Sequence, residues 1–285
     1  MSESAAASWT PDTHAAGYEA RVHRIQAGLS ARKIHGAVLS LAQSRDTDAP
    51  ALEIYRQMCL RNPSTYGICW EEGRLALIGS SPLAYLDVEN GILTLETDAG
   101  TRPVKGNSAE DETARADLLS NAKDAGEHQV VVDAELEALL PLAADGRIDR
   151  PVDREVRRFS HVMHLYTVLQ ARLKAGLGMA DAVLGVFPPA AVSGYPKRAA
   201  LELGVEVEQS DRGPYGGVVG LIRGAQSARF AVIIRSLWRE GSRATLRTGG
   251  KVVPASVPAE EYREALAKAR FIVESVDLAE QRAKR

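Results

Sequence analysis

The chain has 285 residues, of which 45% are hydrophobic and 25% are charged. This composition is typical of a globular protein that can bury one large core or two smaller ones. Lysine and arginine together number 35 against 37 for aspartate and glutamate, which leaves a formal net charge of -2. Because no overall positive field is available to hold a nucleic-acid backbone or an anionic membrane, we expect neither partner.

The sequence also indicates the compartment and the limits of the domain. Its two cysteines, Cys59 and Cys69, are too few for a disulfide framework at this length and indicate free thiols in a reducing compartment. Residues 1–17 are polar and rich in alanine and serine, which predicts a disordered lead-in and not a signal peptide. No apolar stretch is long enough to span a membrane. We expect a cytoplasmic protein with one catalytic domain at 18–276 and a charged tail at 277–285.

The first third of the chain alternates between helical and strand patterns. Apolar spacing predicts helices at 22–31 and 51–60, with a buried strand at 37–41 between them. Strands are predicted at 66–70, 75–79, 84–88 and 92–95. Asn90-Gly91 lies between two of these strands and indicates a hairpin turn. A loop is expected at 97–108.

The rest of the chain is predicted to begin with helices and to continue with strands. A long helix is expected at 109–144, broken near the β-branched residues 130–132, with further helices at 154–175 and 197–203. Strands are predicted at 216–222, 230–238 and 244–253, before a last helix that starts near Pro258. Strands grouped early and late, with helices between them, predict an α+β fold and not an alternating parallel sheet.

Two pairs of acidic residues occur at helical spacing. Asp124 and Glu127 are three positions apart, as are Glu261 and Glu264, so each pair lies on one face of its predicted helix. Four carboxylates brought into one pocket would suit a hard divalent cation such as Mg²⁺. Spacing alone equally fits two ordinary solvated helix faces, so both interpretations stay open.

Several residues could bind or transform an anion, although each has a plain structural explanation as well. His164 could be catalytic or simply packed in its predicted helix, and Ser193-Gly194 could hold a carboxylate or form an ordinary turn. Arg235 closes an apolar run, where an arginine is costly unless it faces an anion or an acid. The remaining donors are Tyr215, Gly249, Gly250 and Lys268. Together with the acidic pairs they describe a site for a dianionic substrate.

Seven short motifs occur in the chain, at residues 78–82, 99–102, 124–128, 162–165, 193–197, 212–217 and 261–270. Their order resembles that of the chorismate-utilising enzymes, which include anthranilate synthase component I and the aminodeoxychorismate, isochorismate and salicylate synthases. The resemblance covers about residues 22–273. It implies two large antiparallel sheets packed as a sandwich with helices outside. It also implies a short form that lacks most of the amino-terminal region and its regulation by tryptophan.

The resemblance also implies roles for individual residues. Asp124, Glu127, Glu261 and Glu264 would hold Mg²⁺, which binds the ring carboxylate of chorismate. Tyr215, Arg235, Lys268 and the Gly249-Gly250 backbone would hold the enolpyruvyl carboxylate. His164 would assist aromatisation, and the Ser193-Gly194 backbone would contact a carboxylate.

The chain departs from the family pattern at positions that matter for catalysis. A glutamate that protonates the departing hydroxyl in the family is Leu83 here, and leucine cannot donate a proton. The position of a nucleophile-activating lysine or glutamine is Gly36, and an expected third glycine is Lys251. Glu96 is a candidate to stand in for the missing acid. Lys105 resembles a covalent nucleophile, but the register of the motif at 99–102 places it in a downstream loop.

Three functions remain open from the sequence. The first is a lyase of aromatic-compound biosynthesis like anthranilate synthase component I, which takes chorismate and ammonia and releases pyruvate. Its ammonia would come from a separate glutamine amidotransferase subunit. The second is an enzyme like the isochorismate, salicylate or aminodeoxychorismate synthases. The third is a divergent member that binds a chorismate-like ligand with altered or lost catalysis.

Overall fold

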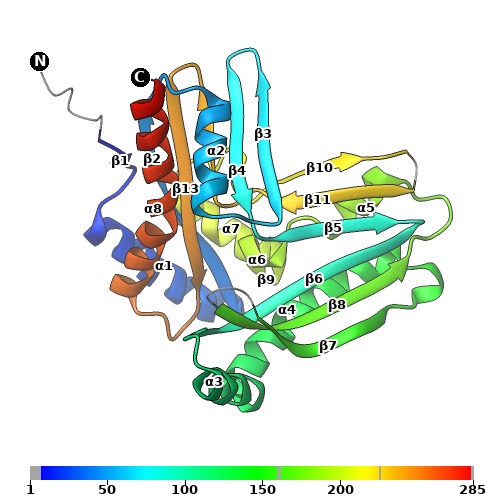
Figure 1. Ribbon diagram of the computed structural model, residues 1–285. Helices are drawn as coiled ribbons and strands as arrows, with labels where there is room; N and C mark the ends of the chain where they lie inside the picture. Colours follow the sequence, from blue (N-terminus) through cyan, green and yellow to red (C-terminus); the bar gives the residue numbers. More distant parts are fainter. Residues whose placement is uncertain (1–7, 159–161, 225, 284–285) are drawn as a thin grey trace, which may run out of the picture. The chain divides into compact units, whose positions relative to one another are not determined.

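The computed structural model describes residues 8–158, 162–224 and 226–283 (Figure 1). The chain divides into two compact units. The first unit comprises Met1–Leu83, Val192–Val219 and Ala231–Arg285, and the second comprises Ala84–Ala191 and Gly220–Phe230. Each unit is therefore built from segments that are far apart in the sequence.

The first unit contains a seven-stranded antiparallel sheet with the strand order β1-β2-β13-β12-β4-β3, and β9 pairs separately with β2. Its strands are β1 (Thr10–Pro11), β2 (Gly36–Asp46), β3 (Tyr66–Glu72), β4 (Leu75–Ser81), β9 (Gly194–Tyr195), β12 (Ser236–Glu240) and β13 (Arg243–Val252). Its helices are α1 (Ala15–Arg32), α2 (Ala51–Arg61), α7 (Lys197–Glu208) and α8 (Pro258–Ala283). The short helix α6 (Ala190–Ser193) lies where the chain re-enters this unit.

The core of the first unit lies between one face of this sheet and its helices. Alternate residues of β2, namely Ala37, Leu39 and Leu41, are fully buried in a cluster with apolar residues of α1, α7 and α8. A second cluster joins α2 and α8 to β4, β12 and β13 around Ile78 and Leu237. Side chains alternate between the two faces of a strand, so the neighbouring positions of β2 point to the other face.

The second unit contains a six-stranded sheet with the order β10-β11-β5-β6-β8-β7. Its strands are β5 (Ala84–Glu89), β6 (Ile92–Pro103), β7 (Asp149–Arg158), β8 (Val162–Arg172), β10 (Val218–Ile222) and β11 (Ser227–Val232). Its helices are α3 (Ser108–Ser120), α4 (Ala122–Leu139) and α5 (Met179–Val186), with short 3-10 turns at Leu140–Leu142 and Ala144–Gly146. Helix α4 packs on β6 and β8.

These elements confirm the predicted α+β class with two antiparallel sheets. The four early strands lie where the sequence placed them, and helix α2 matches the prediction at 51–60. Asn90 and Gly91 both have positive φ, of 51° and 74°, as the predicted hairpin turn requires. No helix in the described part of the chain is both long enough and apolar enough to cross a membrane.

The predicted helix at 154–175 is wrong, because this segment forms β7 and β8. Every second residue of β8 from Met163 to Ala171 is buried, which is the period of a strand with one covered face. The valine, threonine and tyrosine residues of this segment also favour a strand over a helix. His164 therefore lies on a strand and not on a helix.

Three other boundaries differ from the prediction. The break in the long helix falls at Asn121, whose side chain caps α4, while the β-branched residues Val131 and Val132 are buried within α4. Strand β6 continues through part of the expected loop to Pro103. The predicted strand at 230–238 is two strands in different sheets, and Arg235 between them has a positive φ of 52°.

The two ends also differ from their predicted boundaries. Residues 8–17 belong to the predicted lead-in, yet β1 pairs with β2 there and α1 begins at Ala15. Helix α8 continues through the predicted tail to Ala283. Residues 1–7 and 284–285 lie outside the described part of the chain.

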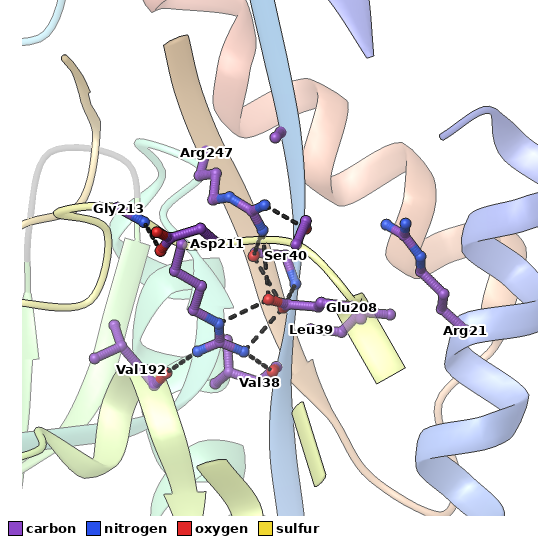
Figure 2. Close-up of polar contacts among 12 residues, drawn as sticks. Arg21, Val38, Leu39, Ser40, Val192, Glu208, Asp211, Gly213 and Arg247 are labelled. Carbon is purple, nitrogen blue, oxygen red and sulfur yellow. Dashed lines mark hydrogen bonds and ion pairs between the residues drawn. The ribbon is translucent and has the colours of Figure 1, made fainter. Parts of the chain in front are cut away.

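A buried ionic cluster joins three elements of the first unit (Figure 2). The Glu208 carboxylate at the end of α7 accepts hydrogen bonds from the backbone nitrogen and the hydroxyl of Ser40, at 2.7 and 2.9 Å. It also accepts two bonds from Arg212, at 2.8 and 2.9 Å, and one from Arg247 of β13, at 3.4 Å. The side chain of Glu208 is fully buried and that of Arg247 nearly so. The cluster fixes the strand segment that leads directly into Gly249-Gly250.

Candidate functional site

The acidic pair of α8 lies against the glycine pair of β13. A Cβ atom placed on Gly250 would lie 3.0 Å from a Glu261 oxygen and 3.5 Å from a Glu264 oxygen. Lys268 forms an ion pair with Glu264 at 2.5 Å and donates a hydrogen bond to the Gly249 carbonyl at 2.8 Å. Because Gly249 and Gly250 carry no side chains, the Glu261 and Glu264 carboxylates and the Lys268 ammonium group lie directly against the backbone of β13.

The Glu261 carboxyl is held in an unfavourable environment for its charge. Burial raises its pKa, and the charge of Glu264 raises it further, while a hydrogen bond from Ser256 and the charge of Lys268 act in the opposite direction. A nearby cation would relieve this cost. The contact with Ser256 was not anticipated from the sequence.

Gly249 is required by the close approach of two strands. A Cβ atom on this residue would lie 2.0 Å from the Leu39 carbonyl oxygen and 2.8 Å from the Ser40 Cα. Both are backbone atoms, so the clash could be relieved only by moving β2 away from β13.

We expect Gly249→Ala to lower the free energy of unfolding by at least about 2 kcal/mol, which is within the range for overpacked interior sites. Gly126→Ala is the matched control, because a Cβ on that helical residue would meet nothing within 4 Å. The control should leave stability unchanged or slightly increased. Denaturant unfolding of both variants measures the difference, and equal midpoints would contradict the close approach.

Arg235 lies within electrostatic reach of both Glu264 and Tyr215. Burial lowers the pKa of Arg235, and the neighbouring Tyr215 and Glu264 partly counter that effect. Tyr215 is 8% exposed, and burial raises its pKa to about 12. The left-handed backbone of Arg235 is costly for a residue other than glycine, so the surrounding structure must stabilise it. The five donors that the sequence predicts for the enolpyruvyl carboxylate thus all lie in the first unit. They are Tyr215, Arg235, Gly249, Gly250 and Lys268.

The Ser193-Gly194 turn joins α6 to β9, and both residues are buried. Gly194 has a φ of 120°, and a Cβ there would lie 2.1 Å from the Gly36 carbonyl oxygen. Strand β9 pairs with the start of β2, with Tyr195 opposite Gly36. The turn therefore sits beside Gly36 in the first sheet.

The acidic pair of α4 belongs to the second unit. Asp124 is largely buried and accepts a hydrogen bond from Arg102 at 2.6 Å, whereas Glu127 is half-exposed and lies 3.8 Å from Lys123. A Cβ on Gly100 would lie 3.2 Å from an Asp124 oxygen. Gly100 occupies the bulge of β6 with a φ of 71°. Asp124 therefore faces a glycine, as Glu261 does. Its partner Arg102 belongs to the motif at 99–102, for which the resemblance implied no role.

His164 lies beside the same bulge. Its Nδ1 is 3.0 Å from the Gly100 carbonyl oxygen, on the neighbouring strand β8. Gly100 is thus shared between the histidine and Asp124. The second unit therefore brings a predicted catalytic residue and a predicted metal ligand to one bulge.

Glu96 has other contacts in the second unit. Its carboxylate accepts a hydrogen bond from Arg157 at 3.0 Å, and the Arg157 guanidinium lies 4.6 Å from the centre of the Tyr166 ring. Burial, and next the charge of Glu96, raise the pKa of Tyr166. To act as an acid, Glu96 would have to leave this ion pair. Lys105 lies after the end of β6, in the loop that its register predicts, where it is exposed.

The two acidic pairs belong to different units, with two carboxylates in each. Over its described residues, neither unit alone gathers three or more histidine, cysteine or acidic side chains as a metal site. Each pair nevertheless offers hard oxygen donors beside a glycine.

The chain is similar to proteins of known sequence and structure. Residues 1–274 match the family described as chorismate binding enzyme. The chain is 38% identical over 216 residues to an anthranilate synthase component 1 of Haloarcula marismortui, covering 76% of this chain and 43% of that protein. It is 32% identical over 263 residues to the Bacillus subtilis anthranilate synthase component 1, covering 92% and 51%. The chain thus spans about half the length of these curated relatives.

Solved structures give the same result for the fold. Anthranilate synthase component I of Streptococcus pneumoniae superimposes with a TM-score of 0.85 at 28% identity, covering 93% of this chain and 59% of that one. The menaquinone-specific isochorismate synthase of Escherichia coli gives a TM-score of 0.82 at 22% identity, covering 94% and 62%. At that identity the second likeness concerns the fold alone.

Proposed function

Since the chain belongs to the chorismate-binding enzyme family, we propose that it binds chorismate together with Mg²⁺ and converts it in the manner of anthranilate synthase component I. The observation that carries this proposal is the cluster at the end of β13. There, bare glycine backbone, two cationic side chains and two carboxylates meet within one unit.

The cationic part of this cluster suits a carboxylate ligand. Arg235 offers a planar fork of donors that matches a carboxylate, and Lys268 offers a point charge beside the Gly249 carbonyl. We assign the enolpyruvyl carboxylate to these residues, with the Tyr215 hydroxyl and the glycine backbone as further donors. The buried position of Arg235 makes an anionic partner more favourable than water would be.

The carboxylates suit a hard divalent ion. Asp124, Glu127, Glu261 and Glu264 would hold Mg²⁺, which when bound supplies positive charge for the ring carboxylate of chorismate. In the structure Arg102 and Lys268 pair with one carboxylate of each set. A glycine lies beside each set, Gly100 next to Asp124 and Gly250 next to Glu261.

The side chains near the β6 bulge suit proton transfer. His164 holds its Nδ1 at the Gly100 carbonyl, which orients the ring, and we assign this imidazole to proton exchange during aromatisation. Leu83 offers no proton, and we assign Glu96 as the candidate replacement. In the ammonia-using reaction a glutamine amidotransferase subunit would supply ammonia.

The test is incubation of the purified chain with chorismate, Mg²⁺ and ammonium. Anthranilate fluorescence together with pyruvate would support the proposed reaction. Salicylate or isochorismate formed without ammonium would instead indicate a water-using enzyme. Leu83 favours one further candidate, a divergent member that binds without turnover. That candidate predicts thermal stabilisation by chorismate and Mg²⁺ without product. No stabilisation and no product would contradict the proposal.

Restoring an acid at position 83 should increase turnover. Leu83 is half-exposed in the connection after β4, and its backbone carbonyl, not its side chain, accepts the bond from Val232. We therefore expect Leu83→Glu to fold normally and to raise elimination of the chorismate hydroxyl by about 10²–10⁴-fold, the usual contribution of a positioned acid. Pyruvate release measures the gain.

Leu83→Gln is the matched control for this substitution, because glutamine has the same length but no ionisable proton. It should show no gain. Equal rates for the two variants would mean that position 83 does not face the departing hydroxyl.

A further inference from the structure

A buried tyrosine hydroxyl reaches the strand that pairs with the glycines of β13. Tyr18, near the start of α1, is fully buried, and its hydroxyl donates a hydrogen bond to the Leu39 carbonyl oxygen at 3.3 Å. Leu39 lies opposite Gly250 in the pairing of β2 with β13. The same carbonyl oxygen would lie 2.0 Å from a Cβ on Gly249. The hydroxyl therefore holds β2 at the point where it approaches the glycine pair.

The glycine pair makes this point of the sheet easy to deform. A glycine within a strand weakens the pairing, because it brings more backbone freedom and no side chain that packs. No side chain on Gly249 limits movement of the Leu39 carbonyl toward β13. A hydrogen bond from a buried donor fixes such a carbonyl, and its loss is costly because a buried polar group loses a partner. The Tyr18 hydroxyl supplies this bond.

The ring of Tyr18 contacts α8 at the acidic pair. The centre of the ring lies 5.6 Å from that of Tyr262, and the two ring planes are tilted by 50°. Tilted aromatic pairs at this separation are favourable. Tyr262 follows Glu261 directly in the sequence, and Glu264 comes two residues later. One side chain of α1 thus contacts both β2, through its hydroxyl, and the turn of α8 that carries the two acids.

The Tyr18 phenol stays protonated in these surroundings. Burial raises its pKa, and the charge of Glu261 is the next largest cause. Tyr215, Glu208 and Glu264 act in the same direction. Tyr18 is therefore a permanent hydrogen-bond donor that adds no charge to the site, and it lies within electrostatic reach of both acids of α8.

We infer that Tyr18 is a positioning residue of the ligand site. Its hydroxyl fixes the Leu39 carbonyl beside the glycine pair, and its ring fixes the turn of α8 that carries Glu261 and Glu264. The inference rests on the function proposed above, because the ligand is chorismate bound with Mg²⁺. It gives a role to α1, a helix that carries no motif and no predicted site residue.

Tyr18→Phe tests the role of the hydroxyl and keeps the ring. Loss of one neutral hydrogen bond should lower the melting temperature of the ligand-free chain by only about 2–4 °C. The Kd for chorismate in the presence of Mg²⁺ should rise about tenfold or more, the usual cost of losing a group that orients metal ligands. An unchanged Kd would overturn the inference.

Tyr85→Phe is the matched control for this substitution. Tyr85 is 3% exposed, and its hydroxyl donates to the Val183 carbonyl oxygen at 2.6 Å, so the change removes a bond of the same kind. Tyr85 and Val183 belong to β5 and α5, which carry no predicted site residue. The control should lower the melting temperature by a similar amount and leave the Kd unchanged. Equally weakened binding in both variants would make the effect one of general stability and would overturn the positioning role.

Amide hydrogen exchange tests the same role without a ligand. In Tyr18→Phe the amides of residues 249–251 should exchange faster than in the native chain, because their pairing with β2 opens more readily. Residues 243–246, at the other end of β13, are the internal reference and should change less. Equal changes at the two ends of the strand would contradict the inference. If the native chain binds no chorismate, the proposed function fails, and the exchange rates alone then decide whether Tyr18 holds the two strands.

Discussion

Replacing Glu208 with glutamine is expected to lower the free energy of unfolding by roughly 3–5 kcal/mol, the usual cost of breaking a buried ion pair. The carboxylate accepts bonds from Ser40, Arg212 and Arg247 and has no exposed side-chain surface. A glutamine amide would turn an NH₂ group toward the guanidinium groups and leave both positive charges buried without an acid. Urea unfolding followed by circular dichroism measures the loss.

Glu206→Gln is the matched control on the same helix. Glu206 is exposed and pairs with Arg32 at the surface, where such a pair contributes at most about 1 kcal/mol. A loss confined to Glu208→Gln would locate the stability in the buried cluster. Similar losses for both variants would show that the charge at 208 has no special role.

Glu261→Gln is expected to abolish the thermal stabilisation that Mg²⁺ and chorismate produce together, and to reduce any turnover by at least about 10²-fold. Mutation of a residue that only supports a metal ligand typically costs about 10–100-fold in affinity or activity, and loss of a proposed metal ligand itself should cost more. Without metal, the variant should melt no lower than the native chain. The reason is that burial and Glu264 already disfavour the Glu261 charge, so its removal costs the apo fold nothing. Thermal melts with and without Mg²⁺ and chorismate provide the measurement.

Glu260→Gln is the control, because Glu260 is exposed in the same turn of α8. It should keep the full melting shift. An unchanged shift in Glu261→Gln would remove that residue from the metal shell, and with it the assignment of the α8 pair.

The sequence predicted best where one local signal dominates. The Asn90-Gly91 turn predicted the hairpin of β5 and β6, and helical spacing that ends before Asn62-Pro63 predicted α2. It failed at β7 and β8, where arginine and glutamate between apolar residues also fit a helix. Only the neighbouring strand β6, far away in the sequence, selects the extended form through its ladder with β8.

The candidate site shows the same contrast between local motifs, which can be read from the sequence, and long-range contacts, which cannot. Motif order selected Asp124, Glu261 and Lys268 as candidate site residues, and in the structure each lies beside a glycine or its backbone carbonyl. Motif order did not reveal that Arg102 pairs with Asp124, because that contact joins β6 to α4 across a bulge. Nor did it reveal that Lys251 lies over Gly36, because pairing of β13 with β2 is a long-range event.

The strand order of the first sheet has a consequence for synthesis on the ribosome. Strand β13 lies between β2 and β12, yet it follows every other strand of the described residues in the sequence. Before β13 is translated, β2 lacks its neighbour on the β13 side. Before α8 is translated, α1 and α2 lack the helix that packs against both of them. The nascent protein therefore completes its largest sheet and acquires Gly249, Gly250, Glu261 and Lys268 in the same late step. Binding competence and the folded first unit should thus appear together once β13 and α8 have both been translated.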